Sequence, residues 1–305
     1  MLIDNEEVVG LLSIAEAINF LEEFFASDEF ITPSRKYIDL KNEKIVFTCG
    51  NVKNGAISGF RAYWQYDNKR KFTDHITVIV DNKKNNIKGI ITGNNLGLIR
   101  TGAIGGVAID HLSNKDSKIL GVLGTGLQAK TQVLSALCTR DFKKVIVYSR
   151  NPKSVLDFIN DISKATPKST EFIGANYCKE VVTIADVLIC ATNSKRPLFP
   201  KEWLKPGVHI NAIGPKGITE HEIGLDVLNY CDFIVTDSLI QVHDYPTKTL
   251  LSLCHLYNSV IDLKNVVKEN LKKNKRKEND ISLFYSVGIS GSEVYLGNKI
   301  LDKLY

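Results

Sequence analysis

The sequence has no long apolar run and no cysteine pairing pattern, and these absences exclude several classes of protein. No run approaches the ~20 apolar residues of a membrane-spanning helix, so we expect no membrane span. The six cysteines form no CxxC pair and show no zinc-like spacing with histidine. We therefore expect buried, reduced thiols and no metal site, which indicates a reducing compartment.

The chain also lacks the basic start of a signal peptide, because its first residues, MLIDNEEVVGLL, are acidic. The formal net charge of +5 is small for 305 residues. The densest basic run, residues 272–277, has no interleaved aromatic residues and is followed by acidic ones, which is typical of a solvated loop. We expect a cytoplasmic protein that binds neither nucleic acid nor membranes.

The most informative pattern that is present begins with the apolar run Ile119–Leu123. The glycine turn that follows consists of Gly124, Thr125, Gly126, Leu127, Gln128 and Ala129. Apolar residues at helical spacing come next, and strand, glycine turn and helix together form the arrangement that holds a dinucleotide pyrophosphate. We expect Gly124 to permit the turn, Gly126 to admit the phosphates and Ala129 to let the helix pack closely on the strand.

Two patterns of elements divide the chain. Short strand-like runs follow one another over residues 44–91, with an antiparallel hairpin predicted around the turn at 81–86. After residue 114, fully apolar strands alternate with helices, as in a parallel sheet covered on both faces. We expect an α/β protein: a Rossmann doubly wound parallel sheet over 114–280, inserted in a mixed α+β domain made of 1–113 and 281–305, with the active site in the cleft between them.

Several segments, in order, resemble the ornithine cyclodeaminase/μ-crystallin family. They are LIRTGA at 98–103, GTGLQA at 124–129, ADVLICAT at 185–192, PGVHINAIG at 206–214 and SVG at 286–288. The resemblance spans nearly the whole chain and implies a nicotinamide-dependent enzyme that acts on amino acids, imino acids or ketimines. It also implies a homodimer built through the non-Rossmann domain, which is thereby expected to bind substrate and to dimerise.

Three arginines are the expected substrate ligands. The substrates of this family carry a carboxylate, which an arginine can hold with two hydrogen bonds. The resemblance assigns this role to Arg100, and it places Arg35 near the substrate. Arg61 stands where many members have a lysine at the reacting centre, so we expect it to act in both binding and catalysis. Each of the three has a structural or surface arginine as its alternative.

The proton donor is less clear from the sequence. Arginine stays protonated at neutral pH, so Arg61 can neutralise a carboxylate or stabilise developing negative charge but cannot exchange a proton. We expect Glu222 to be the catalytic acid or base. Other candidates are His221, Asp74 and Glu293.

The loop at 220–226 departs from the family pattern. In cyclodeaminases an aspartate there holds the distal amine of the substrate, and Gly224 aligns with it here. Asp226 can replace it only if the loop is rearranged. Because a buried, unpaired ammonium is costly, we favour imine reduction or another amino-acid redox reaction over ornithine cyclodeamination.

Cofactor choice depends on the end of the second Rossmann strand. NAD enzymes usually have an acidic residue there, but this chain has Ser149, Arg150 and Asn151. Arg150 can pair with a 2′-phosphate, so we expect NADP(H) to be favoured over NAD(H); a solvated loop arginine is the alternative. By resemblance, Thr101, Thr192 and Gly214 are also expected to lie near the cofactor.

These observations predict an NAD(P)-dependent oxidoreductase acting on CH–NH or CH–NH2 donors, which transfers hydride to or from the C–N carbon of an imino or amino acid. Two alternatives remain. One is an ornithine cyclodeaminase, which forms proline and ammonia without net redox change. The other is an NADPH-binding protein with vestigial catalysis.

Overall fold

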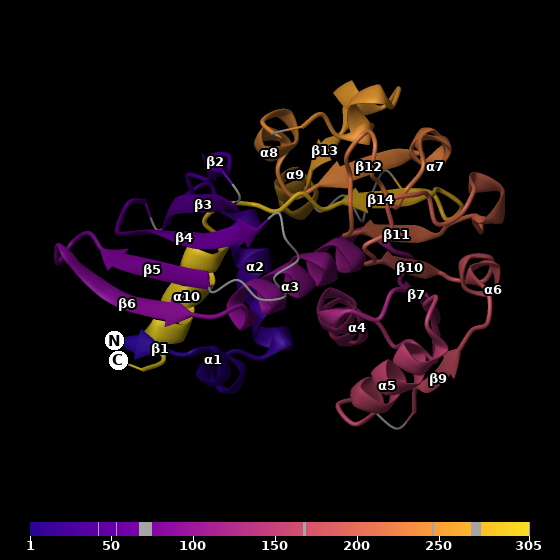
Figure 1. Ribbon diagram of the computed structural model, residues 1–305, viewed down its shortest axis with the longest axis horizontal. Coiled ribbons are helices and arrows are strands. Elements are labelled where there is room, and N and C mark those ends of the chain that lie inside the picture. The colour runs from indigo at the N-terminus through magenta and orange to yellow at the C-terminus, as the bar shows by residue number, and fades with distance from the viewer. Residues whose placement is uncertain are drawn as a thin grey trace. The chain divides into compact units, whose positions relative to one another are not determined.

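The structure, a computed structural model, describes residues 1–41, 43–52, 54–66, 75–166, 169–245, 247–269 and 276–304. The chain divides into two compact units (Figure 1): unit 1 is Met1–Arg100 with Gly288–Tyr305, and unit 2 is Thr101–Val287. Asp74 and the basic residues 272–275 lie outside the described residues. In the described ranges, no helix is long and apolar enough to cross a membrane.

Unit 1 is built on a six-stranded sheet in the order β1-β6-β5-β4-β3-β2. Its strands are β1 (Leu2–Ile3), β2 (Lys36–Leu40), β3 (Glu43–Val52), β4 (Ile57–Tyr66), β5 (His75–Asp81) and β6 (Asn86–Thr92). Its helices are α1 (Asn5–Leu11), α2 (Ile14–Ala26), α10 (Ser292–Asp302) and the start of α3 (Asn95–Leu112), which continues into unit 2. β5 and β6 form the predicted antiparallel hairpin.

One face of this sheet is covered by α10, which Figure 1 shows crossing behind the strands. The helix is buried along almost its whole length, from Ser292 to Leu301. Tyr295 of α10 contacts Phe24 of α2, which ties the two helices together. α2 begins at Ser13 with a capping box to Glu16, as its sequence predicts.

Unit 2 contains an eight-stranded, fully parallel sheet in the order β13-β12-β14-β11-β10-β7-β8-β9. Its strands are β7 (Ile119–Leu123), β8 (Lys144–Tyr148), β9 (Glu171–Gly174), β10 (Val187–Cys190), β11 (His209–Ala212), β12 (Phe233–Thr236), β13 (Ile261–Asp262) and β14 (Ser282–Tyr285). Its α-helices, besides the rest of α3, are α4 (Leu127–Thr139), α5 (Pro152–Ser163), α6 (Cys178–Val182), α7 (Leu225–Tyr230), α8 (Leu239–His243) and α9 (Leu263–Glu269). Two separate apolar clusters pack against it, so both faces are covered and the predicted α/β class is confirmed.

The unit boundaries differ from the expected 1–113, 114–280 and 281–305. β14 pairs with β11 and β12 inside the parallel sheet, so residues 282–285 belong to unit 2. All four residues of β14 are buried, as a strand in the interior of such a sheet requires. The second half of α3, from Thr101, also joins unit 2. The shift of β14 follows from strand pairing between segments far apart in sequence, which no local pattern reveals.

Candidate active site

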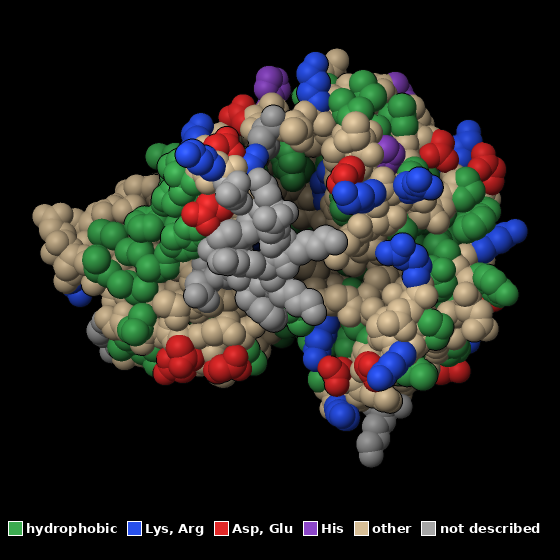
Figure 2. Space-filling view, in the orientation of Figure 1, with side chains coloured by type: hydrophobic (Ala, Val, Ile, Leu, Met, Phe, Trp, Pro, Cys, Tyr) green, Lys and Arg blue, Asp and Glu red, His purple; other side chains and the backbone are tan. Residues whose placement is uncertain are grey.

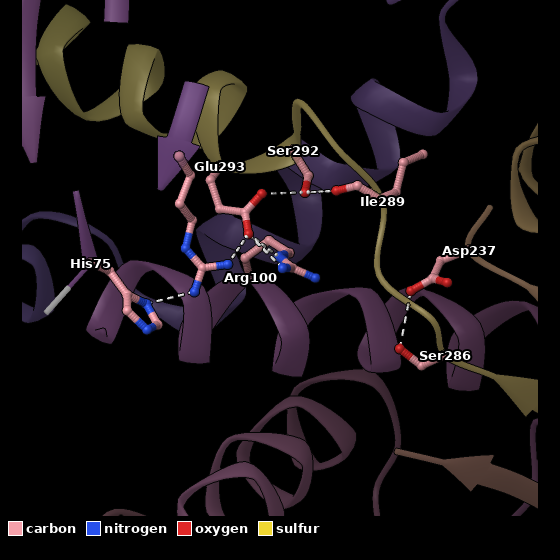
Figure 3. Close-up of polar contacts among 8 residues, drawn as sticks. His75, Arg100, Asp237, Ser286, Ile289, Ser292 and Glu293 are labelled. Carbon is pink, nitrogen blue, oxygen red and sulfur yellow. Dashed lines mark hydrogen bonds and ion pairs between the residues drawn. The ribbon is translucent and has the colours of Figure 1, made fainter. Parts of the chain in front are cut away.

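Two of the predicted substrate ligands meet at one buried carboxylate in unit 1. Arg61, on β4, donates from Nη1 to Glu293 Oε1 at 2.9 Å, and Arg100, on α3, donates to the same oxygen from Nε at 3.0 Å and from Nη2 at 2.5 Å (Figure 3). Ser292 donates to the other carboxylate oxygen at 3.1 Å. The three charged residues are 7%, 5% and 1% exposed, respectively, so this cluster is almost dry. We call Arg61, Arg100 and Glu293 the arginine cluster.

His75, at the start of β5, extends the arginine cluster. Arg61 Nη2 lies 2.6 Å from His75 Nδ1. Because arginine only donates, Nδ1 must be the acceptor and the ring must be neutral. Burial and, to a smaller extent, the charge of Arg61 together lower the pKa of His75 to about 3. His75 therefore orients Arg61 without adding charge.

The arginine cluster carries an excess of positive charge. Burial alone would raise the pKa of Glu293, but Arg100 and Arg61 outweigh burial and hold this pKa at about 2, so the carboxylate is ionised. Two guanidinium charges and one carboxylate charge leave one positive charge inside unit 1. Burial and repulsion from Arg100 lower the pKa of Arg61, although Glu293 opposes them. An added anion would relieve this repulsion.

Arg35, the third predicted ligand, approaches Arg100 at Gly288. A Cβ atom built on Gly288 would lie 2.6 Å from Arg35 Nη2 and 3.5 Å from Arg100 Nη1, so both guanidinium groups reach this backbone position. Gly97 makes room for Arg61 in the same way, since its Cβ would lie 2.7 Å from Arg61 Nη2. The structure thus brings Arg35, Arg61 and Arg100 into one neighbourhood, as their expected shared role requires.

The predicted dinucleotide turn lies between β7 and α4 in unit 2. Gly124 has φ +112°, and a Cβ there would be 2.3 Å from the Ala191 carbonyl oxygen, so only glycine fits. Gly126 is the N-cap of α4, where no described side chain caps the helix, and its Cβ would meet nothing within 4 Å. This combination leaves an open, electropositive helix N-terminus that suits a pyrophosphate.

Other predicted cofactor residues surround that turn. Leu127 is 58% exposed although apolar. The Gln128 Oε1 acceptor is buried and has no hydrogen-bond partner among the described residues, so it can accept from a ligand hydroxyl. Thr125 Oγ1 donates to Ser154 Oγ at 3.0 Å, and Ser154 Oγ lies 3.4 Å from Ser149 Oγ. The hydroxyl groups of these residues connect the glycine turn to the end of β8.

Arg150 and Asn151 follow Ser149 at the end of β8. Asn151 caps α5 by accepting from Lys153 N at 3.1 Å, so its side chain stabilises the helix start. Arg150 is exposed. Among the residues that the structure describes, no carboxylate follows this strand at positions 149–151, which is the pattern on which the NADP(H) prediction depends.

Glu222 joins two further predicted cofactor residues, Thr192 and Gly214. Its Oε2 accepts from Thr192 N at 2.9 Å and from Thr192 Oγ1 at 2.8 Å, and its Oε1 accepts from Gly214 N. Burial raises the pKa of Glu222, although Lys216 and these hydrogen bonds oppose the shift. Glu222 therefore holds the carboxyl ends of β10 and β11 together, and its catalytic role stays a prediction.

Thr101, another predicted cofactor residue, lies on α3. Its backbone carbonyl oxygen accepts a hydrogen bond from Gln132 Nε2 at 2.9 Å.

The acid candidate His221 and the possible amine ligand Asp226 both have local structural partners. His221 Nδ1 lies 3.1 Å from the carbonyl oxygen of Gly217, and Asp226 accepts from the backbone N–H of Lys201 at 3.0 Å. Asp226 also lies in the first turn of α7, where a carboxylate stabilises the helix. Its exposed carboxylate thus has a local role, and its Oδ1 would lie 2.3 Å from a Cβ atom built on Gly224, the position where the resemblance places the cyclodeaminase aspartate.

One residue that sequence reasoning missed is Lys216, two residues beyond Gly214. It is 7% exposed, and its Nζ donates to the Gly214 carbonyl oxygen at 2.6 Å. The segment Pro215-Lys216-Gly217 has the composition of a solvent-exposed turn, so no local signal marks this lysine as buried.

Comparisons with known proteins identify the family. The sequence profile of the ornithine cyclodeaminase/mu-crystallin family matches residues 1–304. A Delta(1)-pyrroline-2-carboxylate reductase of Bacillus cereus is 27% identical over 312 residues, covering 99% of this chain and 93% of the relative.

Solved structures agree on the fold. The Delta(1)-pyrroline-2-carboxylate reductase of Thermococcus litoralis, in complex with NADH and L-proline, superposes with a TM-score of 0.85 at 24% identity, covering 99% of this chain and 97% of that one. An archaeal alanine dehydrogenase dimer with bound NAD superposes with a TM-score of 0.87 at 22% identity, covering 99% and 95%. The expected resemblance and fold class are confirmed, and the chain belongs to the ornithine cyclodeaminase/mu-crystallin family.

Proposed function

We propose that this protein is an NAD(P)-dependent reductase that adds hydride to the C=N carbon of an imino acid, or runs the reverse oxidation of the amino acid. The observation that carries the proposal is the arginine cluster, whose two guanidinium groups share a single carboxylate. Its uncompensated positive charge favours an anionic ligand, and a substrate carboxylate fits the planar guanidinium donors. The Bacillus cereus relative, a reductase of a cyclic imino acid, supports the same class of substrate.

In this proposal the chain's own residues bind and orient the reactants. Arg100 and Arg35 hold the substrate carboxylate, and Arg61 stabilises negative charge near the reacting carbon. Glu293 and His75 fix the direction of the guanidinium groups. The dinucleotide, bound at Gly124–Gln128 with Thr101, Thr192 and Gly214 beside it, supplies the hydride.

A substrate panel tests this function. NADPH oxidation is followed with cyclic imino acids, with 2-oxo acids plus amines, and with L-ornithine. We expect net oxidation with an imino acid. Ammonia release from ornithine without net oxidation would support a cyclodeaminase instead, and tight NADPH binding without either reaction would support vestigial catalysis.

The carboxylate ligand can be tested separately. Arg100→Lys keeps the charge but loses the two-donor fork, and a hydrogen bond between charged groups contributes ~1.5–3 kcal/mol. We expect KM for a cyclic imino acid to rise roughly 10- to 100-fold. An uncharged cyclic imine without the carboxylate is the matched control, and an equal effect on both substrates would contradict the assignment of Arg100.

We further propose that NADP(H) is preferred over NAD(H). The preference rests on the exposed cation Arg150 and the hydroxyls of Ser149 and Ser154 at the end of β8, where an NAD enzyme usually has a carboxylate. Titration with both reduced cofactors tests it: Arg150→Ala should weaken NADPH binding roughly 10-fold or more and leave NADH binding unchanged. Equal affinity of the wild type for both cofactors would overturn the preference.

A homodimer is the proposed assembly. The face of the unit 1 sheet opposite α10 is apolar: the register aligns Ile38, Ile45 and Trp64 in one row and places Phe60 beside Cys49 in another. Ile38 and Phe60 are 48% and 37% exposed, and Figure 2 shows hydrophobic side chains gathered over these strands. Apolar surface of this kind is typical of an interface. Light scattering should give a dimer, and Phe60→Glu should give a monomer.

A further inference from the structure

Lys216 is a buried lysine that has no role in the reaction proposed above. It follows β11, at the carboxyl edge of the parallel sheet, the edge at which such sheets bind their ligands. Its ammonium donates to the carbonyl oxygen of Gly214. The backbone N–H group of Gly214 in turn donates to the Glu222 carboxylate. Lys216 therefore lies next to the strand ends where the nicotinamide half of a dinucleotide is expected.

The groups that face Lys216 come from four neighbouring segments. Glu222 and Asp237 are the carboxylates that act on its charge, and Cys190 is the nearby thiol. The ammonium also lies 5.6 Å from the ring centre of Tyr285. Asp237 accepts from Ser286 Oγ at 3.0 Å (Figure 3) and from Val287 N at 2.8 Å. Of the two carboxylates, Glu222 acts more strongly on the charge of Lys216 than Asp237 does.

These surroundings suit a lysine that gains and loses a proton. Burial lowers the pKa of Lys216 to about 8, although the charges of Glu222, Asp237 and Cys190 oppose the shift. Burial also raises the pKa of Glu222. The pKa of Cys190 is raised well above its usual range, so its thiol is neutral and does not compete. An acid whose pKa lies near the operating pH transfers protons most effectively.

The other buried charged residues described above are unsuited to this step. Arg61 replaces the family lysine and cannot release a proton at neutral pH. Glu293 is ionised, because the arginines hold its pKa at about 2. Glu222 has both oxygens occupied by Thr192 and Gly214.

Resting on the proposed function, we propose that Lys216 donates the proton to the substrate nitrogen during imine reduction. As hydride reaches the imine carbon, the C=N π electrons move to nitrogen, and nitrogen takes one proton from the Lys216 ammonium. The products are the amine, the oxidised dinucleotide and a neutral lysine, which regains a proton from water. In the reverse direction the neutral lysine accepts the proton.

The pH dependence of kcat in both directions tests this role. In the wild type, reduction should fall as pH rises through about 8, where Lys216 loses its proton, and oxidation of the amine should rise over the same range. Lys216→Arg keeps the positive charge but cannot release the proton, so reductive kcat should drop roughly 100-fold or more and this alkaline fall should disappear. Lys216→Met, which is apolar and of similar length, should show the same losses without the charge.

A common substrate, a control variant and the wild-type activity together separate a failure of the Lys216 role from a failure of the proposed function. All variants are measured with one substrate, so titration of the imine itself is common to every profile. Lys143→Arg, an exposed lysine before β8 at the opposite end of the strands, should leave the profile unchanged. A wild type that reduces no imino acid overturns the proposed function and this role together. A wild type that reduces one, with unchanged profiles in both Lys216 variants, overturns the role of Lys216 alone.

Discussion

Each unit of the protein buries a group of ionisable side chains, and the two groups behave in opposite ways. In unit 1, direct hydrogen bonds from Arg61 and Arg100 hold the pKa of Glu293 at about 2 in spite of burial. In unit 2, the effect of burial is larger than that of the neighbouring charges and hydrogen bonds. The pKa of Glu222 is therefore raised and that of Lys216 falls to about 8. Burial therefore fixes charge where ions pair closely and moves pKa values toward neutrality where they do not.

This difference separates two tasks of an imino-acid reductase. A fixed positive charge suits binding, because the affinity for a carboxylate then stays constant around neutral pH. A titrating lysine suits proton transfer.

The largest expected effect is the loss of the carboxylate in Glu293→Gln. The substitution leaves two buried guanidinium charges without their anion, so the free energy of unfolding should fall by ~3–5 kcal/mol. Urea unfolding of the full chain measures this. Glu23→Gln is the control: Glu23 pairs with Lys299 at a side chain that is 56% exposed, and its loss should cost under ~1 kcal/mol. A smaller loss for Glu293→Gln than for Glu23→Gln would contradict this description.

The second effect is the acid dependence of that stability. Glu293 has a pKa of about 2 when folded, against 4.5 as an ordinary glutamate, so the unfolded chain binds its proton more tightly. The stabilisation is therefore complete above pH 4.5 and is lost as pH falls toward 2; it amounts to ~3 kcal/mol. The difference in unfolding free energy between wild type and Glu293→Gln should shrink over this range. A difference independent of pH would show that Glu293 is not ionised by its partners.

The sequence predicts well what depends on neighbouring residues. The capping box at Ser13, the β5–β6 hairpin, the glycine turn and the alternation of strands and helices in unit 2 all follow from local chemistry and periodicity. The resemblance to the family predicted Arg35 and Arg100 as substrate ligands, and in the structure the guanidinium groups of both lie beside Gly288.

Contacts between segments far apart in the sequence could not be predicted in this way. Glu293 is 232 residues from Arg61 and 193 from Arg100, so nothing local marks it as their shared partner. β14 was expected in the first domain, because its place between β11 and β12 appears only when the sheet is assembled. Lys216 was missed because its burial depends on β14 and on the loop that carries Glu222.

The smallest expected effects come from two glycines, one in each unit, whose substitution by alanine separates packing from ligand binding. In Gly97→Ala the new methyl group would press on Arg61, at 2.7 Å from Nη2. Over-packing costs ~1–3 kcal/mol, and the better helix propensity of alanine offsets up to ~1 kcal/mol of it. The unfolding free energy should thus fall by at most ~3 kcal/mol, while KM for the imino acid rises.

Gly126→Ala should give the converse result. A Cβ at Gly126 meets nothing within 4 Å, and its φ of −82° suits any residue, so the unfolding free energy should change by less than ~1 kcal/mol. The methyl group would, however, occupy the open space at the N-terminus of α4 where a pyrophosphate must approach the backbone. NADPH fluorescence titration should show a weaker complex for Gly126→Ala and an unchanged one for Gly97→Ala. If Gly126→Ala binds NADPH as the wild type does, the open space at this turn is not the phosphate site. That result would contradict the assignment of dinucleotide binding to unit 2 and carboxylate binding to unit 1.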